Sequence, residues 1–391
     1  MKKFRSRLKA FYKLYLKPKK ELKKPPKVDV IIYDRNGFEL LEPYLMGKTH
    51  VTFSTRGESI NLYILLKSIV KLNFWNLNSF NTYITTYIEY VVPKVVITFT
   101  DNDSRFYLIS KQFPSVKTIM IQNGNRGITG DVFDHLEHSD KFRVDFILSM
   151  NVSVGEKYLE YMQGQVIPIG SFKNNMREKV NRIEEDQVLF ISQWAEKPFD
   201  SSVIYFENDG TPIEYEEFFE VDRLVLNFLQ KWCDRNLKQL VILGRELETN
   251  KDEFQYYLNL LPVNSFKFLP QIDSLSNYHE LDKSKIVVFV DSTLGYESIG
   301  RANRTASFAW RRLSNGRQLV RFGWPLELEP EGVFWSSEVS ESNFNKIMDY
   351  LNTVSESEWK NVVEKYQKMH MEYDPGNSIL SNLLKNLLLA G

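Results

Sequence analysis

Residues 285–301, Lys-Ile-Val-Val-Phe-Val-Asp-Ser-Thr-Leu-Gly-Tyr-Glu-Ser-Ile-Gly-Arg, contain a strand, a polar turn and the start of a helix in direct succession. Residues 286–290 are a continuous, mainly β-branched apolar run, which is typical of a central strand buried on both faces. The run ends at residues 291–293, Asp-Ser-Thr, which favour turns and helix N-caps. At such a junction in an open parallel sheet, free backbone N–H groups and the helix dipole attract anions and nucleotides. The segment therefore predicts an α/β fold with a ligand site at this sheet edge.

Four residues of this segment are candidates for contact with the ligand. Ser292 and Thr293 would lie at the start of the helix, and Gly295 would let the backbone come close to the ligand. Glu297, one turn into the helix, could reach a ribose diol. An ordinary strand-to-helix connection with a capping Ser or Thr has a similar sequence, so a purely structural role stays open here.

Length and composition indicate a globular protein with two domains. The chain has 391 residues, enough for two α/β domains with a core each, and 43% of them are hydrophobic. One cysteine, Cys233, excludes an intrachain disulfide and suits a reducing compartment. His135 and His138 have no third ligand nearby in the sequence, so no metal site is expected.

The N-terminal 27 residues are strongly basic. They carry twelve Lys or Arg against the single acid Glu21, a net charge of 12 − 1 = +11, so the remainder of this neutral chain sums to −11. Within this arm an apolar stripe recurs mostly at spacings of three and four, at Phe4, Leu8, Phe11, Tyr12 and Tyr15. Such a pattern is typical of an interfacial helix on anionic lipid, where each basic residue contributes about 1 kcal/mol. Binding to nucleic acid and a merely solvated tail are the competing interpretations.

Nothing in the sequence predicts that the chain crosses a membrane. The arm lacks the apolar core and cleavage site of a signal peptide, and no stretch approaches the roughly 18–20 apolar residues that span a bilayer. Because the body is net acidic, no nucleic-acid partner is expected. The protein is therefore expected to be cytoplasmic and peripheral, held at the inner face of the cytoplasmic membrane by residues 1–27.

Apolar strands alternate with helical patterns along both halves of the body, which favours parallel βαβ units. The expected strands are residues 28–33, 51–53, 95–99, 118–121, 146–149 and 166–169 in the first half, and 188–191, 240–243, 266–269, 286–290 and 305–309 in the second. We predict two Rossmann-like αβα domains, residues 28–180 and 181–375, facing each other across a cleft. Residues 376–391 are expected to form a C-terminal helix that can pack back on the first domain.

Polar residues directly follow the strands of the first domain, where the carboxyl ends of parallel strands share one edge. The candidates on this acceptor side of the cleft are Arg56, Asn102, Arg105, Gln122, Asn123, Gly124, Ser171, Lys173 and Asn174. Three carboxylates could deprotonate a hydroxyl, with Asp101 and Glu58 ranked equally and Asp103 below them. Turn chemistry alone is the competing explanation, because Asp-Asn-Asp and Asn-Gly also favour turns.

The second domain presents groups that suit a phosphate or diphosphate. Backbone N–H groups and guanidinium groups are suitable donors, since Arg can bind such anions with two hydrogen bonds. The candidates are Gly244, Arg245, Ser292, Thr293, Gly295, Glu297, Arg301 and Arg311. The chain has no Gly-x-Gly-x-x-Gly after its first strand and no Walker A motif, which disfavours dinucleotide enzymes and phosphoryl transfer from ATP.

Basic groups opposite carboxylates suit the transfer of a sugar from a nucleotide sugar. The nucleotide sugar would be a substrate, and no cofactor or metal is expected, because helix dipoles and basic side chains can stabilise the leaving phosphate. Residues 101–103 do have the form Asp-x-Asp, so a metal-dependent variant stays open.

Five segments also resemble the sequence blocks of bacterial surface carbohydrate (O-antigen) biosynthesis proteins. They are residues 55–63, 100–106, 121–124, 169–175 and 291–297, and the resemblance extends from about residue 28 to 335. It implies a glycosyltransferase-like protein with a GT-B-type architecture. We therefore expect a glycosyltransferase whose C-terminal domain holds a nucleotide-sugar donor and whose N-terminal domain holds a lipid-linked or surface-glycan acceptor. The chain departs from the usual pattern at residues 125–127, Asn-Arg-Gly, and 302–304, Ala-Asn-Arg.

Two alternatives remain open from the sequence. A retaining transferase of an acidic sugar such as Kdo would use the Arg-rich edge to bind a carboxylate, and would need a carboxylate nucleophile. A non-catalytic subunit of a polysaccharide assembly complex would bind the nucleotide sugar without transferring it.

Overall fold

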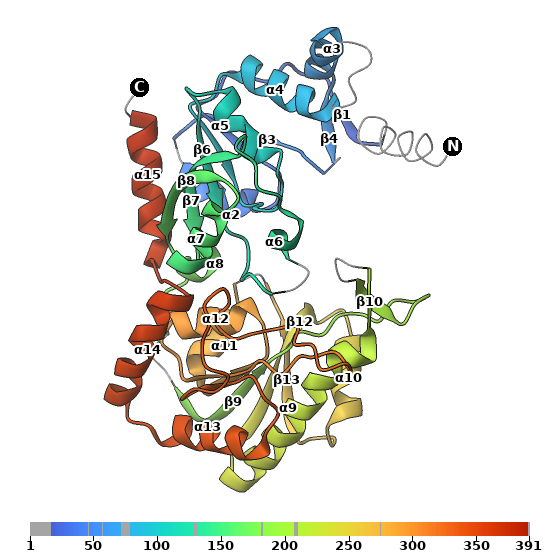
Figure 1. Ribbon diagram of the computed structural model, residues 1–391, viewed down its shortest axis with the longest axis vertical. Helices are drawn as coiled ribbons and strands as arrows, with labels where there is room; N and C mark the ends of the chain where they lie inside the picture. The colour runs from blue at the N-terminus through green and yellow to red at the C-terminus, as the bar shows by residue number, and fades with distance from the viewer. Residues whose placement is uncertain are drawn as a thin grey trace.

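The computed structural model describes residues 17–45, 47–56, 58–71, 79–128, 131–180, 183–206, 210–273 and 275–389. They form two α/β domains that lie one above the other in Figure 1. The apolar stripe predicted in the basic arm, from Phe4 to Tyr15, lies outside the described residues. Within the described part of the chain, no helix combines the length and the apolar character that a membrane crossing requires.

The first domain contains a six-stranded, fully parallel sheet with the order β3-β2-β5-β6-β7-β8. Its strands are β2 (Val30–Tyr33), β3 (His50–Phe53), β5 (Val95–Thr98), β6 (Lys117–Ile121), β7 (Arg143–Ser149) and β8 (Gln163–Pro168). The helices are α2 (Phe38–Leu41), α3 (Leu62–Lys71), α4 (Ser79–Val91), α5 (Ile109–Gln112), α6 (Val132–His135), α7 (Val152–Leu159) and α8 (Phe172–Asn175). Every residue of β2 and β5 is buried, as expected for apolar strands covered on both faces.

The second domain repeats this plan with the strand order β13-β12-β9-β14-β15-β16, again fully parallel. Its strands are β9 (Glu184–Ile191), β12 (Gln239–Leu247), β13 (Phe266–Gln271), β14 (Ser284–Phe289), β15 (Thr305–Phe308) and β16 (Trp335–Ser336). The helices are α9 (Tyr215–Asn236), α10 (Asp252–Leu260), α11 (Asn277–Lys283), α12 (Thr293–Gly300) and α13 (Glu341–Thr353). The prediction of two Rossmann-like domains is confirmed.

After α14 (Glu356–His370) the chain crosses back from the second domain to the first. The crossing segment is bonded to the end of β7: the Asn151 side chain donates to His370 O (2.8 Å), and Glu372 N donates to Met150 O (2.9 Å). Helix α15 (Ser378–Leu389) then runs along the first domain (Figure 1). Its Leu380, Leu384 and Leu388 complete the core on one face of the first sheet. The C-terminal helix therefore belongs structurally to the first domain and ties the two domains together.

Two small sheets lie outside the main ones. Strand β1 (Lys19–Glu21) pairs in parallel with β4 (Ser59–Asn61), so residues 19–21 of the basic arm are part of the first domain. Strands β10 (Val203–Phe206) and β11 (Pro212–Glu214) form an antiparallel hairpin on the second domain.

Candidate functional site

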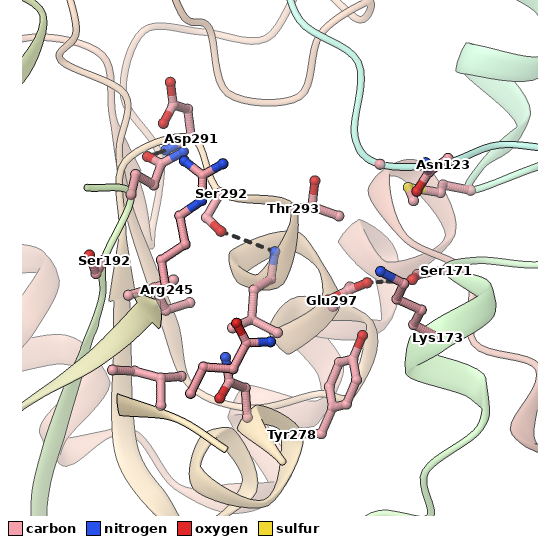
Figure 2. A pocket seen from close by; sticks show the side chains of 18 of the residues that line it. Asn123, Ser171, Lys173, Ser192, Arg245, Tyr278, Asp291, Ser292, Thr293 and Glu297 are labelled. Carbon is pink, nitrogen blue, oxygen red and sulfur yellow. Dashed lines mark hydrogen bonds between the residues drawn. The ribbon is translucent and has the colours of Figure 1, made fainter. Parts of the chain in front are cut away.

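A pocket of about 440 Å³ lies between the two domains. On the first-domain side its walls are residues that follow β5, β6, β7 and β8, and on the second-domain side they come from the ends of β9, β12, β13 and β14 and from α11 and α12. The carboxyl ends of both parallel sheets therefore face one shared space, which is the usual ligand position in open α/β folds. Figure 2 shows this pocket with Lys173 and Ser171 on one side and Arg245 and Ser292 on the other.

The start of α12 forms part of the pocket wall. Ser292 is the N-cap of this helix, and its hydroxyl accepts a hydrogen bond from Leu294 N (3.2 Å). The Thr293 hydroxyl accepts from Asn125 N of the first domain (2.9 Å), so this helix end also joins the two domains. The helix dipole places partial positive charge at this wall, which favours an anionic ligand.

Glu297 is a buried carboxylate in the wall of the pocket. It accepts a hydrogen bond from the Ser171 hydroxyl, which comes from the opposite domain (Figure 2). Burial raises the pKa of Glu297 to about 7, although the hydroxyls of Ser171 and Tyr278 and the charge of Lys173 act in the opposite direction. Glu297 is therefore poised to change its protonation near neutral pH when a ligand adds or removes a hydrogen-bond donor.

Arg245 supplies a cation to the second-domain wall. Its guanidinium lines the pocket, and among the described residues no carboxylate forms an ion pair with it. The backbone that carries it is fixed by Glu253, a fully buried carboxylate that accepts from Arg245 N (2.9 Å) and Glu246 N (2.8 Å). Burial raises the pKa of Glu253, and the hydrogen bonds from Ser192 and from these N–H groups partly offset that effect. Arg245 and Lys173 thus present two cations from opposite domains.

A second pocket, of about 380 Å³, adjoins the first and shares Asp291 with it. Its walls include the aromatic side chains Tyr205 and Phe206 of β10, together with Phe218 and the cationic Arg321. Tyr205 and Phe206 are exposed. This second pocket is therefore more aromatic than the first and opens beside a hairpin of the second domain.

Arg311 lies beneath Asp291 and holds it in place. Its guanidinium is 1% exposed, and Arg311 Nε lies 3.1 Å from Asp291 Oδ2. The same guanidinium lies 3.7 Å from Asp222 and packs 3.8 Å from the centre of the Phe218 ring. Burial raises the pKa of Asp222 to about 7, with Arg311 opposing the shift, and neither oxygen of Asp222 accepts a hydrogen bond from the described residues. Arg311 therefore pairs with the carboxylates Asp291 and Asp222 inside the second domain. This corrects the expectation that it binds a phosphate.

Ten of the residues predicted from the sequence line the first pocket. They are Gln122, Asn123, Gly124, Ser171 and Lys173 of the first domain, and Gly244, Arg245, Ser292, Thr293 and Glu297 of the second. The structure therefore brings together most of the expected donor-side residues and the acceptor-side residues that follow β6 and β8.

None of the three carboxylates expected to act as a base lines this pocket. Asp101 is 2% exposed, forms an ion pair with Arg126 and accepts from the Tyr158 hydroxyl (2.6 Å). Burial raises the pKa of Asp101, while Arg126 and Tyr158 lower it. The expectation that Asp101 faces the ligand is therefore wrong, because a buried arginine binds it inside the first domain.

The other two carboxylates and their neighbours are also directed elsewhere. Asp103 forms an ion pair with Arg105 (2.6 Å) and accepts from the Tyr33 hydroxyl (3.1 Å). Glu58 is exposed and accepts from the Ser54 hydroxyl. Arg56, which pairs with Asp34 (3.2 Å), and Asn102 likewise do not line the pocket. Arg56 and Glu58 follow β3, and β3 is the edge strand of the sheet, which places its carboxyl end away from the centre of the cleft.

Three further predicted residues have structural roles. A Cβ at Gly295 would lie 2.1 Å from the Phe289 ring, so this glycine allows α12 to pack on β14 and is not a point of ligand approach. Arg301 has a fully buried side chain, forms an ion pair with Asp282 (2.5 Å), and donates to the Asn174 side chain (3.1 Å). Arg301 and Asn174 therefore join the domains beneath the pocket instead of binding a ligand.

Several pocket residues were not predicted. Tyr278 and Gln193 line the first pocket, Asp291 lines both, and Glu253 supports Arg245 from behind. Asp291 belongs to the segment 285–301, where its position after the strand predicts only a turn or a helix cap. Within the described residues, no group of three or more His, Cys, Asp or Glu side chains is arranged to hold a metal ion.

The fold is similar to those of many solved structures, two of which serve as examples. One is a putative UDP-N-acetylglucosamine 2-epimerase from Listeria monocytogenes, with a TM-score of 0.52 and 11% sequence identity over 92% of this chain and 96% of that chain. The other is a glycosyltransferase from Rickettsia africae, with a TM-score of 0.51 and 12% identity over 93% of this chain and 99% of that chain. At these identities the likeness concerns the fold, which is the GT-B arrangement of two facing Rossmann-like domains.

Sequence comparison identifies the family. No curated protein matches the chain. Residues 119–388 match the profile of a family described as "putative O-antigen biosynthesis protein", and this match covers more than half of the 391 residues. The resemblance seen in the sequence blocks is thereby confirmed, and the chain belongs to this O-antigen biosynthesis family.

Proposed function

We propose that the protein is a glycosyltransferase that moves a sugar from a nucleotide-sugar donor to a lipid-linked or surface-glycan acceptor. The observation that carries this proposal is the pocket itself. Two parallel sheets direct their carboxyl ends into one space, which contains a helix N-terminus, two cations from opposite domains and a buried carboxylate. These are the groups that recognise a diphosphate and a ribose together.

The donor would lie mainly against the second domain. Its diphosphate would accept hydrogen bonds from Arg245 and from the N-terminus of α12, with Lys173 adding charge from the first domain. Its ribose hydroxyls would donate to Glu297. Fixed donors of this kind stabilise the negative charge that develops on the leaving phosphate.

The acceptor would enter through the second pocket, and Asp291 would receive its proton. Asp291 is the carboxylate that both pockets share, and Arg311 fixes its position. In the proposed step the acceptor hydroxyl oxygen bonds to the anomeric carbon of the donor sugar. The bond from that carbon to the diphosphate oxygen breaks, its electron pair leaves with the nucleoside diphosphate, and the hydroxyl proton passes to Asp291.

A screen of nucleotide sugars tests this proposal. Thermal unfolding of the full chain would be followed with UDP-, GDP-, CMP- and dTDP-sugars. A specific donor at about 100 times its dissociation constant should stabilise the fold by about 2.7 kcal/mol. The best donor would then be incubated with and without glycan acceptors, and the products identified by mass spectrometry and, for sugar isomers of equal mass, by NMR.

The products distinguish the alternatives. Transfer to an acceptor with release of nucleoside diphosphate is the expected result. Conversion of the donor sugar to an isomer without any acceptor would contradict the proposal and indicate an epimerase, the activity named for the Listeria monocytogenes protein of similar fold. Binding without transfer or isomerisation across the panel would indicate a non-catalytic nucleotide-sugar-binding subunit.

Donor binding is expected to tighten as the pH rises from about 6 to 8. Burial raises the pKa of Glu297 to about 7, whereas ribose hydroxyls donate to the ionised carboxylate and therefore favour loss of its proton. Titration calorimetry in buffers of different ionisation enthalpy should detect proton release near pH 7. A nucleotide sugar is the suitable probe, because its diphosphate does not titrate in this range. Glu297→Gln should weaken binding at pH 8 and flatten the pH profile; an unchanged profile in this variant would contradict the assignment.

The raised pKa of Glu297 also predicts how the stability of the unliganded protein depends on pH. Between the ordinary glutamate pKa of about 4.3 and the raised value, the native protein binds more protons than the unfolded chain. Because of Glu297, the free energy of unfolding should therefore fall as the pH rises through this window. The decrease should level off above about pH 7. Urea unfolding at several pH values, compared between the wild type and Glu297→Gln, measures this contribution.

A further inference from the structure

Helix α3 exposes an apolar face. Leu66, Ile69 and Val70 are 64%, 52% and 87% exposed, whereas Ile64 and Ser68 on the opposite side of the helix are buried. Residues 66, 69 and 70 are separated by three and four positions, so they lie on one side of the helix. A group of adjacent exposed aliphatic side chains on one helix marks an interaction surface more often than a single one does.

The described part of the basic arm lies directly beside this helix. Strand β1 pairs with β4, and β4 leads without a break into α3. The Asn61 side chain donates to Lys23 O (2.8 Å), and the Lys24 ammonium lies 5.0 Å from the centre of the Tyr63 ring of α3. Residues 17–27 contain six lysines and one glutamate, a net charge of 6 − 1 = +5. The strongly cationic segment is therefore fixed next to the apolar face.

Lys67 of α3 and Lys27 of the basic segment lie over aromatic rings at this helix. Lys67 lies over the rings of Tyr63 and Tyr90 at 5.2 and 5.6 Å, and Lys27 lies 4.8 Å from the centre of the Tyr90 ring. Leu22, within the basic segment, is 76% exposed. Aliphatic side chains among lysines are the composition of an element that lies in the headgroup region of an anionic bilayer.

Charge complementarity decides which occupant fits this surface. A second copy of the chain would bring the same basic segment, with its net charge of +5, against the first, and like charges would oppose the contact. A neutral apolar partner would leave the lysines without counterions. An anionic lipid surface satisfies both parts at once, since lysines can reach phosphate groups while Leu66, Ile69 and Val70 enter the acyl boundary.

We propose that α3 and residues 17–27 form a membrane-docking surface specific for anionic lipid. In Figure 1 this surface lies at the end of the first domain remote from the second domain. Docking there leaves the pocket between the domains uncovered and open to a water-borne donor. The proposal does not depend on the reaction that the pocket catalyses.

Vesicle sedimentation with the full chain tests this surface. The probe is sucrose-loaded vesicles of phosphatidylcholine with about one quarter phosphatidylglycerol, a headgroup composition that supplies the negative surface potential. The triple variant Leu66→Ser, Ile69→Ser, Val70→Ser removes the apolar face. The matched control, Leu237→Ser, Val263→Ser, Ile272→Ser, removes three side chains of the second domain that are 87%, 71% and 79% exposed. Melting temperatures of both variants confirm that they fold.

The expected result separates these two variants. Wild type and control should sediment with anionic vesicles, and the α3 variant should partition at least about tenfold more weakly. Vesicles of phosphatidylcholine alone, or high salt, should release the wild type. If the α3 variant failed to fold, Lys19→Glu with Lys23→Glu would replace it, with the same loss of binding expected. Equal sedimentation of variant and control, or no sedimentation of the wild type, would overturn the proposal.

Discussion

Replacement of Arg301 by alanine is expected to lower the free energy of unfolding by about 3–5 kcal/mol. Arg301 and Asp282 both have fully buried side chains, and their closest atoms are 2.5 Å apart. Arg301 also donates to Arg177 O (2.9 Å) and Glu178 O (3.0 Å) in the connection between the domains. Removal of the guanidinium leaves Asp282 as a buried charge without this cation and leaves Glu178 O without the hydrogen bond from Arg301, whereas Arg177 O keeps the Tyr373 hydroxyl as a donor (3.0 Å).

A nearby arginine provides the matched control for this experiment. Arg304 forms an ion pair with Glu356, whose side chain is 72% exposed, so water can solvate that carboxylate when Arg304→Ala removes the cation. Urea unfolding followed by circular dichroism should show a much lower midpoint for Arg301→Ala than for Arg304→Ala. Adding Asp282→Asn to Arg301→Ala should recover part of the loss, because it removes the uncompensated charge. Equal midpoints for the two arginine variants would contradict the role assigned to Arg301.

Replacement of Asp291 by asparagine is expected to lower the turnover number of sugar transfer by about 10²- to 10⁴-fold. Asparagine keeps the shape of the side chain but cannot take up the hydroxyl proton. The fold should persist, since an asparagine oxygen at this position can still accept a hydrogen bond from Arg311, which lies 3.1 Å from the Asp291 carboxylate. Donor affinity should change only slightly, because the phosphate and ribose contacts come from Arg245 and Glu297.

Glu58, one of the carboxylates that the sequence predicts as the base, provides the control for Asp291→Asn. Glu58→Gln alters an exposed side chain outside both pockets and should leave transfer unchanged. Initial rates at saturating donor and acceptor, together with donor affinity by calorimetry, separate a loss of chemistry from a loss of binding. Near-wild-type turnover in Asp291→Asn, or a large loss of turnover in Glu58→Gln, would contradict the assignment of Asp291 as the proton acceptor.

The strand positions could be predicted because local sequence determines them. Continuous apolar, mainly β-branched runs such as residues 95–98 and 286–289 have few alternatives to a buried parallel strand. The start of α12 could be predicted for the same reason. Ser292 is a preferred N-cap residue, and Glu297 follows about one helical turn later. These features put Ser292, Thr293 and Glu297 into one pocket.

The roles of the charged residues could not be predicted because they depend on partners far away in the sequence. Asp101 follows β5 as expected, but Arg126 and Tyr158 bind it inside the first domain. Arg301 and Arg311 have the residue type of phosphate ligands, but in the structure they form ion pairs with the carboxylates Asp282 and Asp291. A strand-end carboxylate or arginine can therefore be located from sequence, whereas its chemical task depends on which opposite charge is buried beside it.

Titration calorimetry of the stabilising nucleotide into wild type and Arg245→Ala tests the ligand assignment of the pocket between the domains most directly. Loss of the hydrogen bonds from Arg245 to the diphosphate should cost about 1.5–3 kcal/mol, a dissociation constant about 10- to 100-fold higher. Arg321→Ala, in the second pocket, should bind the nucleotide like the wild type. A nucleotide that binds Arg245→Ala as tightly as the wild type, or no nucleotide binding at all, would contradict the assignment.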